Sequence, residues 1–250
     1  MIQKALPLLN KLVVYVVGLF VLAFGISLSI RANLGVTPMS SIPRALELLA
    51  AGKLSLGVVT MIVYALMLAG QAIVLGKRFK LISLLQLPAT FVFGLFVDLT
   101  NLMLSPIPPI DAYVLRLVFL ALSITFVATG IFLYTSAKLM PLPGEGLVFA
   151  FVERFSLKFH TCKVVFDCSL TTIALIIGIV FMQSMGSVRE GTIISALLIG
   201  LTVKLISTPF KTPLERFLGF DNATIANETE AISEAELLSQ PGETFPETEA

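Results

Sequence analysis

Charged side chains are scarce in this sequence. Only 13% of its 250 residues are Asp, Glu, Lys or Arg, whereas 56% are hydrophobic and the mean hydropathy is +0.96. A soluble domain carries about 25% charged residues, because its surface faces water. The composition therefore excludes an ordinary soluble domain and indicates a protein whose surroundings are lipid.

Metal-binding and nucleophilic residues are equally few. The chain has one histidine and two cysteines, Cys162 and Cys168. Six residues apart on a helix, the two thiols lie on different faces, so they predict neither a disulfide framework nor, by themselves, a zinc site. The sequence also has no Walker loop, no GxSxG and no HExxH. We therefore expect no catalytic residues, no metal ligands and no cofactor, and we predict that the protein is not an enzyme.

Basic residues are absent from the last part of the chain. No Lys or Arg follows Arg216, while eight of the sixteen acidic residues lie beyond Gly219. Acidic segments with few apolar residues cannot bury enough surface to offset the entropy lost on folding. We therefore predict a transmembrane domain over residues 1–218 and a disordered acidic cytoplasmic tail over residues 219–250.

Six apolar stretches are long enough to cross a bilayer, which requires about 20 residues of helix. They cover residues 12–30, 54–76, 81–97 (continuing as apolar sequence to 104), 117–137, 168–188 and 191–208, the last interrupted only by Lys204. We therefore predict an all-α membrane protein with six transmembrane helices. Small residues recur along these spans and predict close helix packing rather than a substrate path: Gly18, Gly25, Gly94, Gly130, Gly178 and Gly200.

Two further apolar segments, residues 32–52 and 137–159, do not have the pattern of a crossing. Each begins with a stretch interrupted by glycine and proline, and continues as a short amphipathic run with charged residues in its middle. Irregular backbone is tolerated at membrane depth only where protein or water satisfies its polar groups. These broken segments therefore predict short helices that are either interfacial or re-entrant, and the sequence leaves both possibilities open.

Positive charge is unequally shared between the two sides of the membrane. With the N-terminus inside, eleven Lys and Arg residues fall on the cytoplasmic side and four fall outside. The loop of residues 105–111 has none. Since basic residues concentrate on the cytoplasmic side of membrane proteins, we predict that both termini are cytoplasmic and that residues 105–111 are outside.

Two parts of the chain resemble each other. Residues 23–38 align with 128–143 without gaps, and seven of the sixteen positions are identical. Apolar composition alone gives about one or two identities over such a length. A weaker match pairs residues 94–99 with 200–205 at nearly the same offset. The chain therefore reads as two related halves.

Each half consists of a span, a broken segment and two more spans. Three crossings is an odd number, so the second half must enter from the opposite side of the membrane. We therefore predict two inverted three-helix repeats, over about residues 11–104 and 113–210. Paired broken segments often form the substrate site of a transporter, where helix N-termini offer N–H groups to an anion. The alternative is that both segments are connectors lying in the interface.

The same residues resemble the YitT/YczE group of bacterial integral membrane proteins. The resemblance extends from about Lys11 to Lys211 and rests on four motifs: Gly25 with Arg31-Ala-Asn-Leu-Gly-Val-Thr-Pro38, Gly94 with Asp98-Leu99, Pro143-Gly-Glu-Gly146, and Gly191-Thr192 with Gly200. The second half departs from the family pattern at Glu145, where an aspartate is more usual, and in the Leu-Met-Pro-Leu-Pro run that ends at Pro143. The resemblance implies a multi-pass protein of the bacterial plasma (inner) membrane, and it supplies neither a substrate nor a reaction.

Ionisable groups inside spans are costly, so each is a candidate for function. Asp98 lies about four residues beyond the centre of its span, with Asn101 one turn further on. Its carboxylate predicts a cation or proton site, and the alternative is a carboxylate that is buried and bonded to a neighbouring helix or that lies near the outer headgroups. Lys163 and Asp167 are four residues apart and predict an ion pair on one helix face.

The other candidates lie in or beside the broken segments. Arg31 ends the first span and could neutralise Glu47, a lipid headgroup or an anionic substrate. Glu145 lies between two glycines in the second broken segment. The full set of candidate substrate-binding or ion-binding residues is Asp98, Asn101, Glu145, Arg31, Gly35, Pro38 and Pro143.

These features together predict a small-solute transporter or channel. The alternative is a membrane-embedded regulatory or scaffold protein without transport activity. A polar cavity between the two broken segments would distinguish the first function from the second. As partners we expect the lipid bilayer and an unidentified small solute but no nucleic acid, and the sequence leaves a homo-oligomer open.

Overall fold

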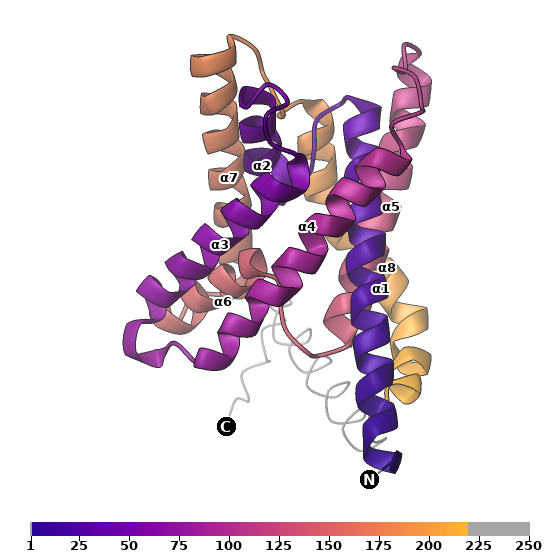
Figure 1. Cartoon of the computed structure of the whole chain (residues 1–250), viewed down its shortest axis with the longest axis vertical. Helices are drawn as coiled ribbons and strands as arrows, with labels where there is room; N and C mark the ends of the chain where they lie inside the picture. Colours follow the sequence, from indigo (N-terminus) through magenta and orange to yellow (C-terminus); the bar gives the residue numbers. More distant parts are fainter. Residues whose placement is uncertain (1, 220–250) are drawn as a thin grey trace, which may run out of the picture.

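The computed structural model describes the backbone of residues 2–219 and the side chains from residue 8 onward, so the predicted acidic tail lies outside the described residues apart from Gly219. Within this range the chain is all-helical (Figure 1). The α-helices are α1 (Ile2–Ala32), α2 (Pro38–Leu49), α3 (Leu56–Leu75), α4 (Gln86–Met103), α5 (Tyr113–Ser136), α6 (Pro143–Phe155), α7 (Phe159–Met182) and α8 (Glu190–Phe217). Two short 3₁₀ helices, Gly76–Arg78 and Leu81–Leu85, connect α3 to α4.

Six of these helices are long and apolar enough to cross a membrane: α1, α3, α4, α5, α7 and α8. Their outer faces carry large apolar side chains that are strongly exposed, among them Leu66, Ile73 and Leu205. Such continuous apolar surface is incompatible with water and suits lipid. The predicted all-α membrane protein with six transmembrane helices is therefore confirmed.

The two broken segments contain the short helices α2 and α6. Each begins at a proline, Pro38 or Pro143, which suits the first helical position because proline lacks the N–H that would remain unpaired there. The backbone before each helix contains a non-glycine residue with positive φ, Asn33 (52°) or Lys138 (50°), which ends the preceding span. With 12 and 13 residues, α2 and α6 are too short to cross a bilayer.

Helix contacts recur in matching pairs between the two halves. α1 packs along α5 (Figure 1). One further span packs on each of these two helices: α4 on α1, and α8 on α5. Similarly α2 packs on α7, while α6 packs on α3. One pair has no counterpart, because α3 packs on α4 whereas α8 hardly touches α7.

The α1–α5 interface is reciprocal at two glycines. A Cβ on Gly25 would lie 2.6 Å from the backbone nitrogen of Val127, and a Cβ on Gly130 would lie 2.5 Å from that of Leu22. In the alignment of the two halves Gly25 corresponds to Gly130, and at the same offset Leu22 corresponds to Val127. The two equivalent residues therefore make the same close contact in exchanged positions, and only glycine permits the helices to approach this closely.

Candidate functional site

The first broken segment is bound to the loop between α7 and α8. The N–H of Gly191 donates to the carbonyl of Leu34 at 2.7 Å, and the N–H of Val36 donates to the carbonyl of Ser187 at 3.2 Å. Leu34 thus satisfies one of the free N–H groups at the start of α8. Because its backbone groups bond to protein, this segment offers few of them to a ligand.

Gly35 and Pro38, two predicted site residues, have structural roles in this segment. Gly35 has a φ of +100°, and a Cβ there would lie 2.4 Å from the Thr192 hydroxyl oxygen. Both the conformation and the close approach require glycine. Pro38 is buried at the start of α2. Neither residue presents a polar group to an open space.

The second broken segment borders a hollow. This hollow has a volume of about 280 Å³ and is lined by Tyr134, Thr135, Lys138, Leu139, Met140, Pro141 and Phe149. The Lys138 ammonium group lies 4.0 Å from the buried carboxylate of Glu215 on α8. The two broken segments therefore differ, since the first is packed against a loop and the second is open to its surroundings.

The starts of α2 and α6 meet. A Cβ on Gly144, the second residue of α6, would lie 2.8 Å from the terminal methyl group of Met39, the second residue of α2. Met39 and Gly144 each lie one residue past the aligned stretches and correspond to each other at the same offset. The Met67 sulfur of α3 lies 3.7 Å from the same point. The first turns of the two short helices therefore touch through the Met39 side chain, with the Met67 thioether beside the contact.

Glu145 follows Gly144 in the first turn of α6 and lies outside the six candidate spans. Burial raises the pKa of its carboxyl group above the ordinary value of 4.5. The Lys163 ammonium group, the Tyr134 hydroxyl and the backbone N–H of Glu145 itself oppose this effect, while Asp167 adds to it. The raised pKa favours the protonated form of the Glu145 carboxyl group over its carboxylate.

Three tyrosines from three spans surround this carboxyl group. Tyr15 of α1, Tyr64 of α3 and Tyr134 of α5 all lie within electrostatic reach of Glu145. The rings of Tyr15 and Tyr134 pack edge to face with their centroids 6.1 Å apart. The hydroxyls of both are buried without a well-formed hydrogen bond, the Tyr134 hydroxyl lying near Glu145. Buried hydroxyls without a partner are costly and often mark a ligand site.

An ion pair completes the ionisable groups at this place. The Lys163 ammonium donates to the Asp167 carboxylate at 2.6 Å, which confirms the predicted i, i+4 pair on α7. Lys163 and Asp167 both act on Glu145, and Asp167 also acts on Tyr64. These three ionisable side chains sum to a charge of minus one when Glu145 is ionised.

Two buried amides flank α6 one residue further on. A Cβ on Gly146 would lie 2.9 Å from the Gln71 side-chain oxygen and 3.0 Å from that of Gln86. Gln71 is 6% exposed and Gln86 is 2% exposed, and both side-chain oxygens lack a hydrogen-bond partner. Further unsatisfied polar groups therefore line the first turn of α6.

Asp98 is placed far from this cluster. Its carboxylate accepts hydrogen bonds from the Ser55 hydroxyl at 2.6 Å and from the N–H of Gly57 at 2.7 Å. Asp98 thus binds the start of α3, whereas Gln71 contacts α6 near the end of α3. Gln71 lies fourteen positions after Gly57, which corresponds to about 21 Å of helix. This arrangement matches the alternative in which the Asp98 carboxylate bonds to a neighbouring helix.

Asn101 and Arg31 are likewise separate from Glu145. Asn101 is partly buried one turn beyond Asp98 on α4. Arg31 reaches toward the 105–111 loop, where its guanidinium lies 3.5 Å from the carbonyl of Ile107, and its Nε is buried without a partner. Of the predicted site residues, only Pro143 and Glu145 lie in the cluster at the start of α6.

The tyrosines and glutamines were missed by sequence reasoning. Tyr15, Tyr64, Tyr134 and Gln71 lie inside uncharged spans, and a search for charged residues passes over them. Tyrosine is rare in this sequence, which has only four. Three of the four belong to this cluster, so their rarity was the signal that the sequence offered.

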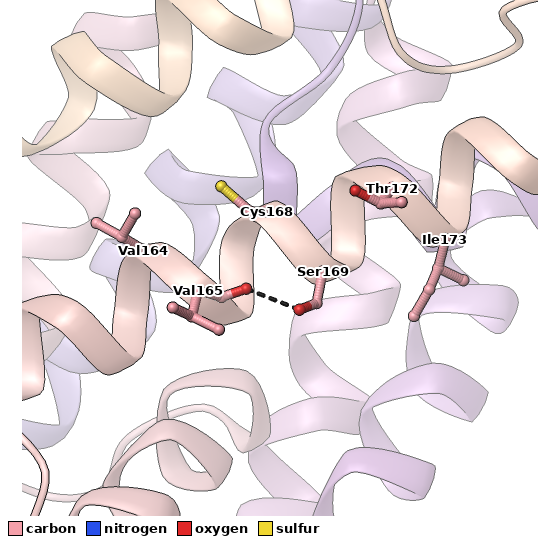
Figure 2. A pocket seen from close by; sticks show the side chains of 6 residues that line it. All are labelled: Val164, Val165, Cys168, Ser169, Thr172 and Ile173. Atoms are coloured by element: carbon pink, nitrogen blue, oxygen red, sulfur yellow. Dashed lines mark hydrogen bonds between the residues drawn. The ribbon is translucent and has the colours of Figure 1, made fainter.

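A second hollow, of about 450 Å³, lies on one side of α7 (Figure 2). All of its lining residues belong to that helix: Val164, Val165, Cys168, Ser169, Thr172 and Ile173. The Ser169 hydroxyl donates to the carbonyl of Val165 at 2.8 Å and is thereby satisfied within the helix. This hollow is an apolar groove in the outer surface, and it brings no ionisable groups together.

The chain is similar to known membrane proteins over most of its length. The family of unknown function DUF6198 matches residues 9–208. The uncharacterized membrane protein YczE of Bacillus subtilis (strain 168) is 25% identical over 191 residues, which are 76% of this chain and 82% of the relative. No solved structure matches the chain. These similarities confirm the YczE-like membrane family that the motifs predicted.

Proposed function

The chain belongs to the DUF6198 family, and we propose that it transports a small solute across the membrane in which its six long helices lie. The observation that carries this proposal is the contact of α2 and α6 at Met39 and Gly144, beside a carboxyl group and buried tyrosine hydroxyls that lack a well-formed hydrogen bond. Two broken segments that meet at a polar site are the arrangement by which inverted-repeat transporters bind their substrates.

Inverted repeats are the second part of the proposal. The reciprocal contacts of Gly25 and Gly130 support a two-fold relation between α1 and α5. The matching pairs α2 with α7 and α6 with α3 support the same relation between the remaining helices. In this proposal residues 11–104 and 113–210 form the two repeats, and the broken segments enter from opposite sides.

The two halves differ at one helix pair, which supports a protein with two states. A Cβ on Gly94 would lie 2.5 Å from the Met61 side chain, because α4 packs on α3. The aligned residue Gly200 on α8 has no atom of the described chain within 4 Å of that position. Closing α8 on α7 while opening α4 from α3 would exchange the environments of the two halves, which is how inverted repeats give alternating access.

For orientation we propose a bacterial plasma-membrane protein with both termini cytoplasmic. The start of α1 and the end of α8 lie at the same end of the molecule in Figure 1, as an even number of crossings requires. The excess of basic residues in the segments at that end supports the cytoplasmic side. We further propose that transport is its whole activity and that it is not an enzyme.

Solute release from proteoliposomes tests the proposed function. Purified full-length protein is reconstituted into vesicles loaded with an isotope-labelled mixture of small metabolites, and release is followed by mass spectrometry. We expect some solutes to leave faster than from protein-free vesicles. Gly144→Leu would push apart the starts of α2 and α6 and should slow release, whereas Gly70→Ala places a methyl group at an ordinary 3.7 Å from the Leu147 side chain and should not. Release no faster than from protein-free vesicles, with the protein correctly inserted, would remove the proposal.

A regulatory or scaffold protein without transport activity is the second candidate. It is favoured by the position of the two hollows, because one lies on the surface of α7 and the other borders only the second broken segment and its neighbours. A scaffold would leave all solutes trapped in the vesicle assay. It would also retain its phenotype in cells when Glu145 is replaced by Gln.

A further inference from the structure

We propose that the site at the start of α6 binds a monovalent organic cation of the ammonium class, and that Glu145 releases its proton when the cation binds. The inference rests on the proposed function, since it names the substrate class for the same site. Charge balance, the chemistry of the surrounding side chains and the unsatisfied hydroxyls each point to this ligand.

Charge balance sets the valence of the ligand. Lys163 and Asp167 neutralise each other across 2.6 Å, so the Glu145 carboxylate is the one excess charge among the three. An unpaired charge is strongly disfavoured where the protein shields it from water. One proton on Glu145 or one monovalent cation beside it restores neutrality. An anionic ligand would double the excess charge, and a divalent cation would reverse it.

The surrounding side chains select the kind of cation. Tyr15, Tyr64 and Tyr134 bring aromatic rings within electrostatic reach of Glu145, although one face of the Tyr64 ring is stacked on Phe93. Aromatic faces attract cations, and Met39 and Met67 add polarizable thioethers. Hard metal cations instead require a shell of about six or more oxygen ligands. No group of three or more His, Cys, Asp or Glu side chains that could hold a metal occurs within residues 2–219. An organic ammonium ion suits these groups better than a metal ion.

The unsatisfied hydroxyls match the donors of an ammonium group. Tyr15 is 6% exposed and Tyr134 is 1% exposed, and neither hydroxyl has a well-formed hydrogen bond. A phenol oxygen can accept a hydrogen bond as well as donate one. A bound ammonium can therefore donate to the Glu145 carboxylate and to one or both tyrosine oxygens, which removes the cost of leaving them unpaired.

The hollow beside Tyr134 gives the ligand a route. Tyr134 lines that hollow and also lies near Glu145, so one side chain connects the opening to the carboxyl group. The Lys138 ammonium at its edge lies 4.0 Å from the Glu215 carboxylate, which the Lys211 ammonium also approaches to 4.0 Å, so this carboxylate offsets only part of the positive charge near the opening.

The exchange conserves charge and atoms. The O–H bond of the protonated Glu145 carboxyl breaks and its proton passes to water. The ammonium ion then pairs with the carboxylate through N–H donation, and no covalent bond forms to the ligand. Site neutrality is the same before and after, so the two cations compete for one position.

Calorimetric titration of the full-length protein in detergent tests the assignment. The probes are butylammonium, butyrate and butanol, which share a carbon chain and differ in charge. Titrations in two buffers of different ionisation enthalpy give the number of protons released. For butylammonium we expect binding with release of up to about one proton per ion, the number falling as pH rises and Glu145 ionises beforehand. Butyrate and butanol should not bind.

Two variants and a matched control accompany the titration. Glu145→Gln should abolish butylammonium binding and proton release, and Tyr134→Phe should weaken binding about tenfold or more through the loss of one acceptor. Glu47→Gln makes the same change on α2, where Glu47 pairs with Arg44, and should bind as wild type does. Tyr134→Phe and the three probes on wild-type protein keep the test decisive if Glu145→Gln fails to fold.

Three outcomes would overturn the assignment. These are tighter binding of butyrate than of butylammonium, butylammonium binding that Glu145→Gln leaves intact, and no binding of any probe. If solute release from proteoliposomes persists in such a case, the substrate class is wrong and the proposed function stands. If release is also absent, both fail.

Discussion

Replacing Gly25 or Gly130 by alanine should destabilise the protein to a similar extent. Each new methyl group would lie 2.6 or 2.5 Å from a backbone nitrogen of the opposite helix, and ordinary contact begins at 3.4 Å, so α1 and α5 must separate locally by about 0.8–0.9 Å. Overpacking of this kind costs about 1–3 kcal/mol. Alanine recovers up to about 1 kcal/mol through its better helix propensity. Because the new methyl group meets backbone rather than a flexible side chain, the overpacking cost lies in the upper part of that range, and a net loss of about 1–2 kcal/mol follows for either variant.

The double variant gives a sharper test of the reciprocal interface. Because one substitution already separates the helices, the second finds part of the space it needs, and the combined loss should be smaller than the sum of the two. Melting temperatures of the purified protein in detergent measure all three variants, with Gly200→Ala as the control. Gly200 faces open space, so its variant should melt at or slightly above the wild-type temperature. Wild-type melting of Gly25→Ala or Gly130→Ala would refute the close packing.

Three further predictions follow from the described side chains and from the charge pattern. Asp98→Ala should cost about 1–3 kcal/mol because it leaves the start of α3 without its acceptor, while Asn101→Ala should cost little; melting temperatures of both variants check this. Burial raises the pKa of Glu145 above 4.5, so the folded protein retains a proton that the unfolded chain has lost, and the free energy of unfolding should fall as pH rises above about 4.5. Melting temperatures measured over a pH series check this, and an equally steep fall in Glu145→Gln and in wild type would contradict it. Reporter domains fused after Leu104 and after Arg216 should lie outside and inside respectively, and equal signals from one side would end the six-span topology.

Much of the fold was predictable because lipid imposes a simple rule on sequence. A crossing helix must be long and nearly free of charge, so the six spans are visible as uncharged intervals. Prolines at 38 and 143 marked the starts of the short helices, since proline suits the first turn and disfavours a helical conformation in the residue before it. Packing was harder to predict. Gly94 and Gly200 are aligned and look alike in sequence, yet only Gly94 contacts a neighbouring helix, because a glycine's environment depends on where the opposite helix lies.

The site was only partly predictable, because charge is a poor guide to position within a bundle. Asp98 and Glu145 are both isolated carboxyl groups in apolar surroundings, and from sequence they ranked as equals. The structure separates them through their donors. Asp98 accepts a hydroxyl and a backbone N–H, so its charge is satisfied within the fold. Glu145 has near it an ammonium group that Asp167 already neutralises and a tyrosine hydroxyl without ordinary hydrogen-bond geometry. A carboxylate whose charge the protein leaves uncompensated must bind a proton or another cation, and that requirement makes Glu145, rather than Asp98, the place where a ligand can exchange.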